Sequence, residues 1–183
     1  MLSQEAQTKP KTTVSREEMM RQWEMTAQNR ELLVRRMGRI PRAWVKTFGC
    51  QGNVADSEKI MGMLVDMGCI RAEEEAQADI VIYNTCAVRE NAEVRLLSMV
   101  GELKRRKMAN PNMMVGLCGC MMQQKDIVGQ IRKSYPFVEL IFGTHVLHTL
   151  PQLINRLLRG ERRVVDSKRA GRSGIFADYV RLR

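Results

Sequence analysis

Four short apolar runs, each followed by an amphipathic stretch, limit the fold of this chain more than any other part of its sequence. The runs cover residues 44–48, 80–83, 113–117 and 138–142, and each ends near Gly, Cys or Asn. After the first run, Ile60, Leu64 and Met67 recur at the spacing of one helix face. Parallel strands need helical crossovers to run in the same direction. The repeats therefore predict an α/β fold, a parallel sheet with helices on both faces.

The chain divides into three segments. Residues 1–42 are a polar stretch and a helical amino-terminal arm that Gly38 and Pro41 end. Residues 43–160 hold the four repeats, and a chain of 183 residues suffices for one compact domain with flanks. Residues 161–183 are predicted to be a basic tail, with weak strand signals at 163–165.

Composition excludes several classes of protein. With 44% hydrophobic and 27% charged residues, the chain is typical of globular proteins. No run approaches the roughly 18 apolar residues of a membrane span, and the first residues lack the apolar core of a secretion signal. We therefore expect a cytoplasmic protein without a membrane partner. The net charge of +10 lies mostly in the flanks, where it attracts phosphates without specifying a nucleic acid.

Three of the five cysteines, Cys50, Cys86 and Cys120, lie just past the end of an expected strand. Because the carboxyl ends of parallel strands face one crevice, we expect these thiols to converge there. Three thiolates suit a soft metal, either zinc with an open fourth position or a cubane iron–sulfur cluster with one iron free of protein ligands. The spacing leaves both open. We interpret Cys69 and Cys118 as packing residues.

Other polar residues near these cysteines are weaker candidates. Asn53, Asp56 and Ser57 stand at the expected start of the first helix of the repeats, where they either cap the helix or line the crevice. Arg89 follows Cys86 by three residues and is a candidate for contact with a cluster or an incoming anion.

Two motifs lie outside the cysteine segments. The basic run consists of Lys104, Arg105, Arg106 and Lys107. It either contacts RNA or complements the carboxyl end of a helix dipole. His145 and His148 stand three residues apart on an expected helix with Thr144 as its cap, and we interpret them as part of a solvated or hydrogen-bonded first turn.

Four longer motifs carry a family resemblance. They are TFGCQGNVADSE at 47–58, NTCAVRE at 84–90, GLCGCMMQQ at 116–124 and FGTHVLHTLPQL at 142–153. They resemble the methylthiotransferases, and look like the amino-terminal domain of the branch that adds a methylthio group at C2 of isopentenyladenosine beside the tRNA anticodon. The resemblance implies that Cys50, Cys86 and Cys120 hold an auxiliary [4Fe–4S] cluster at which sulfur is delivered.

Other parts of that family have no counterpart in this sequence. The family's radical domain uses S-adenosylmethionine and a second [4Fe–4S] cluster on CxxxCxxC, a spacing absent from these five cysteines, and its TRAM domain binds RNA. The resemblance therefore implies a module inactive alone, with 161–183 starting a linker to missing domains in this or another chain, and with tRNA as the whole enzyme's partner. Two alternatives are a zinc-bound or metal-free module that binds RNA or protein, and the branch that modifies a ribosomal protein.

Overall fold

The computed structural model describes residues 14–87 and 92–167 as alternating strands and helices. The helices are α1 (Arg16–Met37), α2 (Gln51–Asp66), α3 (Ala92–Ala109), α4 (Lys125–Ser134) and α5 (Leu150–Leu158). The strands are β1 (Arg42–Phe48), β2 (Ile70–Arg71), β3 (Ile80–Thr85), β4 (Met114–Gly119), β5 (Leu140–Phe142) and β6 (Val164–Asp166). Short 3-10 helices are η1 (Glu75–Gln77), η2 (Cys120–Gln123) and η3 (Thr144–Thr149). Within these residues, no helix has the length and apolar character needed to cross a lipid bilayer.

The strands form one parallel sheet in the order β2-β1-β3-β4-β5-β6. The expected parallel α/β fold is confirmed, and its four predicted strands correspond to β1, β3, β4 and β5. Two edge strands complete the sheet. β2 has two exposed residues, and β6 lies within 161–183, the segment predicted as a tail, where it pairs in parallel with β5.

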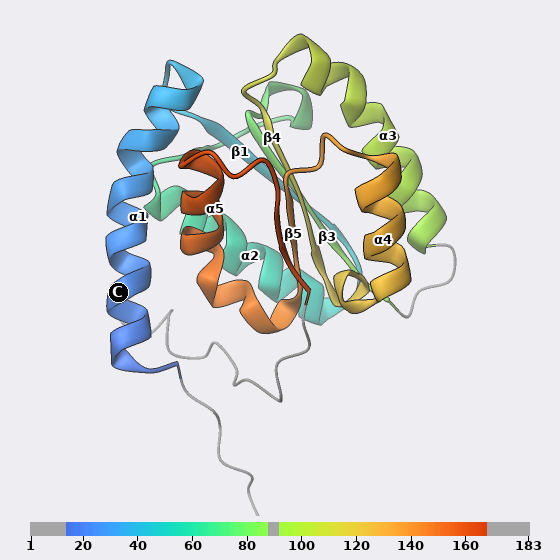
Figure 1. Ribbon diagram of the computed structural model, residues 1–183, viewed down its shortest axis with the longest axis horizontal. Coiled ribbons are helices and arrows are strands. Elements are labelled where there is room, and N and C mark those ends of the chain that lie inside the picture. The colour runs from blue at the N-terminus through green and yellow to red at the C-terminus, as the bar shows by residue number, and fades with distance from the viewer. Residues whose placement is uncertain (1–13, 88–91, 168–183) are drawn as a thin grey trace, which may run out of the picture.

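Helices cover both faces of the sheet, as Figure 1 shows. One face carries α2 and α5, with α1 outside them, over a core that includes Met63, Leu64 and Leu153. The opposite face carries α3 and α4 over a second core that includes Leu96 and Ile131. Every residue of β3 and β4 is buried, because both strands lie between these two layers.

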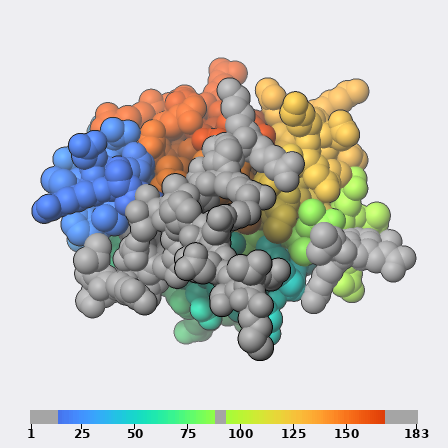
Figure 2. Space-filling model, turned by 90° about the horizontal axis from the view of Figure 1, so that it is seen from below, coloured from blue at the N-terminus to red at the C-terminus, as the bar shows by residue number. Residues whose placement is uncertain are grey.

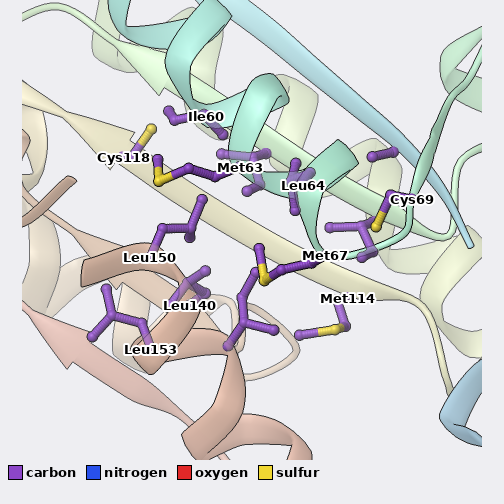
Figure 3. Packing of buried hydrophobic residues seen from close by; sticks show 14 of the residues in the cluster. Ile60, Met63, Leu64, Met67, Cys69, Met114, Cys118, Leu140, Leu150 and Leu153 are labelled. Atoms are coloured by element: carbon purple, nitrogen blue, oxygen red, sulfur yellow. The ribbon is translucent and has the colours of Figure 1, made fainter. Parts of the chain in front are cut away.

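Cys69 and Cys118 belong to the first of these cores, as predicted. Figure 3 shows Cys118 beside Ile60 and Met63, and Cys69 beside Leu64, among apolar side chains. Burial raises the pKa of the Cys69 thiol to about 12. Burial likewise raises the pKa of Cys118 far above its usual value. Both cysteines therefore behave as small apolar packing residues.

The amino-terminal arm is a helix that packs along α5. Its cap is Ser15, whose hydroxyl accepts from the amide of Glu18, and Gly38 ends it in the left-handed conformation. The buried amide of Asn29 donates to the carbonyl of Pro151 at 2.7 Å, and its oxygen accepts from the side-chain amide of Asn155 at 2.8 Å. Seen from below in Figure 2, α1 and α5 lie side by side, away from α3 and α4.

The strand order reverses direction between β1 and β3. From β1 the chain crosses through α2 to β2 on one side, whereas from β3 it crosses through α3 to β4 on the other. Because α2 and α3 lie on opposite faces, the segments that leave β1 and β3 diverge at their carboxyl ends. Open α/β sheets bind ligands at such a switch point, and Cys50 and Cys86 follow these two strands.

Candidate cysteine site

The three predicted cysteines follow three adjacent strands whose ends are in register. Phe48 of β1 lies opposite Thr85 of β3, and Thr85 lies opposite Gly119 of β4. Cys86 and Cys120 come one residue after this row, and Cys50 comes two residues after it. Since adjacent strands are about 4.8 Å apart, the sheet brings segments 36 and 34 residues apart in the chain to one edge.

Cys50 is an exposed thiol at the start of α2. It occupies the N-cap position, so the helix begins at Gln51 and Asn53 stands in its first turn rather than at its cap. The pKa of the Cys50 thiol is lowered, chiefly by the backbone N–H of Asn53 and next by that of Gly52. Amide groups at a helix start favour negative charge, so the thiolate form of Cys50 is easier to reach than that of an ordinary cysteine.

Cys86 is buried directly beside Cys50. Its amide donates to the carbonyl of Phe48 at 2.9 Å, which continues the pairing of β1 and β3 one residue past the strands. Its thiol lies within hydrogen-bond reach of the Cys50 sulfur and contributes to the lowered pKa there. The thiols of Cys50 and Cys86 are therefore neighbours in the metal-free protein.

Cys120 depends on the unusual backbone of the glycine before it. Gly119 has φ 107° and ψ −176°, a region open almost only to glycine. A Cβ at this position would collide with the carbonyl oxygen of Thr85 and press on the side chain of Asn84. The absence of a side chain at Gly119 lets the end of β4 lie close against β3. The chain then enters η2, whose first residue is the half-buried Cys120.

A buried polar network supports the segments that carry Cys50 and Cys86. The side-chain amide of Asn53 donates to Asn84 Oδ1 at 3.1 Å, and that of Asn84 donates to the Asn53 carbonyl at 2.8 Å. Asn84 also donates to Ser57 Oγ at 3.0 Å, and Ser57 accepts from Thr47 at 2.7 Å. The Asn53 oxygen in turn accepts from the Cys50 amide at 3.2 Å. These bonds fix α2 against β3 next to the thiols.

Asn84 is a residue that sequence reasoning missed, although it lies in the NTCAVRE motif. It is fully buried at the end of a strand of apolar residues, and an asparagine there is a signal of a satisfied polar network. Asn53 and Ser57 join that network, whereas Asp56 is half-buried and pairs with Lys59 at 3.3 Å. Arg89 lies outside the described residues.

The basic run divides into two pairs. Arg106 donates to the carbonyls of Glu75 and Ala78, and Lys107 donates to the carbonyls of Pro111 and Met113 and pairs with Glu139 at 3.1 Å. Lys104 and Arg105 are exposed on the same helix. Arg106 and Lys107 thus use donors to fasten α3 to its surroundings, and the other two cations face solvent.

The His145 and His148 segment differs from the expected helix. It forms the 3-10 helix η3, with Gly143 in place of Thr144 as the preceding cap, and Val146 departs from helical angles inside it. Both ring nitrogens of His145 are buried without a hydrogen-bond partner within the described residues, so the expectation of a solvated or hydrogen-bonded first turn is wrong for this side chain. His148, by contrast, has interactions of its own.

No three or more His, Cys, Asp or Glu side chains in the described segments gather closely enough to hold a single metal ion. All five cysteines are free thiols. What the site offers is three thiols around one end of the sheet, one exposed, one half-buried and one buried.

The cysteines are expected to react very differently in the metal-free protein. Iodoacetamide at pH 8 should modify Cys50 first, because it is exposed and its pKa is lowered. Cys69 and Cys118 should stay unmodified in the folded protein, since both are buried and their pKa values are raised. Peptide mass spectrometry after timed labelling measures the order. Early labelling of Cys118 would contradict its placement in the core.

Fold and site together define a class, a doubly wound parallel α/β domain with a cysteine after each of three adjacent strands, two of them at the switch point of the sheet. The chain belongs to the family described as Uncharacterized protein family UPF0004, which matches residues 42–143. The matched region begins with β1 and ends just after β5, so it includes all three candidate cysteines.

Curated relatives carry a more specific name. The chain is 46% identical over 122 residues to the tRNA-2-methylthio-N(6)-dimethylallyladenosine synthase of Thermoanaerobacter sp., 67% of this chain and 26% of the relative. It is 44% identical over 156 residues to the synthase of the same name from Acetivibrio thermocellus, a match that covers 84% of this chain and 32% of the relative. It is 47% identical over 122 residues to the synthase of the same name from Clostridium botulinum, a match that covers 67% of this chain and 27% of the relative. The chain spans about a quarter to a third of the length of these relatives.

Proposed function

We propose that this chain is the auxiliary cluster domain of a tRNA methylthiotransferase, with Cys50, Cys86 and Cys120 holding one [4Fe–4S] cluster. The observation that carries the proposal is the in-register row Phe48–Thr85–Gly119, after which the three thiols follow on adjacent strands. The names of the relatives support tRNA adenosine as the substrate of the whole enzyme.

The donor set suits such a cluster. Thiolates are the usual ligands of iron–sulfur centres, and a cubane takes each thiolate on a different iron. The three sulfurs therefore need to surround a common volume rather than a common ion. Three ligands leave the fourth iron open, and when bound the cluster supplies a site where an exogenous sulfur atom can be attached.

The residues of this chain have separable roles in the proposal. Cys50 is favoured as a thiolate by the amides at the start of α2. Asn53, Ser57 and Asn84 hold that helix end against β3, so they position Cys50 relative to Cys86. Asp56 and Arg89 remain proposed neighbours of the cluster.

Steps beyond the cluster belong to other domains. Hydrogen removal from adenine C2 and methyl transfer need S-adenosylmethionine and a second cluster. We propose that other domains bind S-adenosylmethionine and this second cluster, either in the same chain or in a separate one. The exposed Lys104 and Arg105 are the cations we propose for tRNA contact in that assembly, since Arg106 and Lys107 are occupied by carbonyls and Glu139. The isolated domain is expected to be inactive. The whole enzyme is expected to act in the cytoplasm.

Anaerobic reconstitution with iron and sulfide tests the proposal. About four irons and four inorganic sulfides per chain are expected, with broad visible absorption. A colourless protein that holds one zinc ion, or nothing, would overturn it in favour of a zinc-bound or metal-free binding module.

Mass spectrometry of tRNA and of ribosomal proteins from cells lacking the gene distinguishes the tRNA-modifying branch of the family from the branch that modifies a ribosomal protein. The loss of the methylthio group is expected in tRNA.

A further inference from the structure

His145 lies in η3, just past the end of β5, and β5 is the strand next to the one that leads to Cys120. Cys118 of β4 pairs with Phe142 of β5, so Cys120 and Thr144 each come two residues after that pair. The side-chain amide of Gln123, in the same 3-10 helix as Cys120, donates to Thr144 Oγ1 at 2.9 Å. The histidine segment is therefore bonded directly to the Cys120 segment, on the side away from Cys86.

Both ring nitrogens of His145 are buried, and neither meets a hydrogen-bond partner within the described residues. An imidazole always carries at least one N–H, so this side chain brings in a donor for which the described part of the chain offers no acceptor. His148, the other histidine of the chain, differs because it has interactions of its own. The unsatisfied ring is thus a property of His145 rather than of the segment.

The ring of His145 lies directly against the backbone of Gly143. A Cβ on Gly143 would lie 2.6 Å from both Nδ1 and Cε1 of His145 and 3.2 Å from Cγ of Gln123. The imidazole therefore occupies the space that a side chain at position 143 would need. The ring and the side chain of Gln123 thus both lie against Gly143, just past the end of β5, and the described residues offer the ring no acceptor.

We propose that His145 donates a hydrogen bond to a sulfur atom on the Cys120 side of the group that the three cysteines hold. The inference rests on the proposed function, because the acceptor is a sulfur of the cluster or of the thiolate that binds it. Thiolate and sulfide sulfurs carry negative charge and accept hydrogen bonds, and such bonds tune the reduction potential of the cluster. His145 then follows β5, the strand next to the three that precede the cysteines, and it orients and polarises the sulfur that accepts its hydrogen bond.

Two substitutions isolate this hydrogen bond in the reconstituted protein. His145→Phe keeps a flat ring and removes the donor, whereas His145→Gln keeps an N–H. His148→Phe is the matched control, because it removes the chain's other imidazole three residues away. Three quantities are measured on each: iron and sulfide content, the midpoint potential of the cluster, and ¹⁵N hyperfine coupling in the reduced cluster of histidine-labelled protein.

The expected result is full iron content in every variant, with a lower midpoint potential in His145→Phe than in wild type or His148→Phe. His145→Gln should restore part of the difference. The ¹⁵N coupling should disappear with His145→Phe and persist with His148→Phe.

The outcomes separate this inference from the proposed function. A wild-type protein that binds no cluster overturns the proposed function. A cluster that forms normally, shows no ¹⁵N coupling to His145 and keeps its potential in His145→Phe overturns only the hydrogen bond. Loss of iron from both His145 variants, with circular dichroism unchanged, would make His145 a ligand and also overturn the hydrogen bond.

Discussion

Replacing Cys50, Cys86 or Cys120 with alanine is expected to abolish cluster binding in each case. Each substitution removes one of three thiolates, and two ligands leave two irons of a cubane open to solvent. Iron and sulfide analysis after identical anaerobic reconstitution measures the loss. Because Cys50 is exposed, Cys50→Ala should leave the stability of the metal-free domain nearly unchanged, which separates ligand loss from unfolding.

Cys69→Ala and Cys118→Ala are the matched controls, since they also remove one thiol each. Both side chains lie in the apolar core, so these variants should keep full iron content and lose some stability instead. A protein that needs Cys118 and tolerates the loss of Cys120 would show that the ligands of the site are wrongly assigned.

Gly119→Ala is expected to cost about 2–6 kcal/mol of unfolding free energy. Backbone strain in its conformation accounts for about 1–3 kcal/mol. Displacement of the Thr85 carbonyl by the new Cβ adds about 1–3 kcal/mol. Urea denaturation of the metal-free domain measures the sum. Because Cys120 is the next residue, the variant should also bind less iron than wild type.

Gly160→Ala separates the two causes. Gly160 has the same φ of 107°, but a Cβ there meets no described residue within 4 Å, so only backbone strain remains. If Gly119→Ala destabilised the domain no more than Gly160→Ala does, the close contact between β3 and β4 at the cysteine edge would be disproved.

Hydrophobic periodicity predicted the central part of the fold, and its failures have physical causes. β2 is not among the four predicted runs, although Cys69 stands at an expected strand start, because two exposed residues between buried Cys69 and Ala72 carry no alternation. β6 gave weak strand signals, because a three-residue edge strand in a basic segment resembles a tail. The expected start of α2 at Asn53 is too late, because the helix begins at Gln51. Cysteine is not among the preferred N-cap residues, whereas Asn53 is of a preferred type.

The candidate site was predictable where it depends on topology alone. Parallel strands place their carboxyl ends together, so the positions of Cys50, Cys86 and Cys120 after three runs were enough to predict one edge. The polar network around Asn84 was not predictable, because its partners come from α2 and no local pattern relates positions 53, 57 and 84. The ring of His145, which has no hydrogen-bond partner in segments 14–87 and 92–167, lies against Gly143, and an HxxH spacing gives no sign of that packing.

The register of Phe48, Thr85 and Gly119 links ligand binding to the integrity of the domain. In the unfolded chain the three thiols are dispersed over 70 residues, so a group that needs all three binds the folded state alone and stabilises it by mass action. That stabilisation acts on the pairing of β1, β3 and β4, whereas β2 and β6 can open at the edges without releasing a ligand. Amide exchange should therefore slow most in the three central strands when the site is filled.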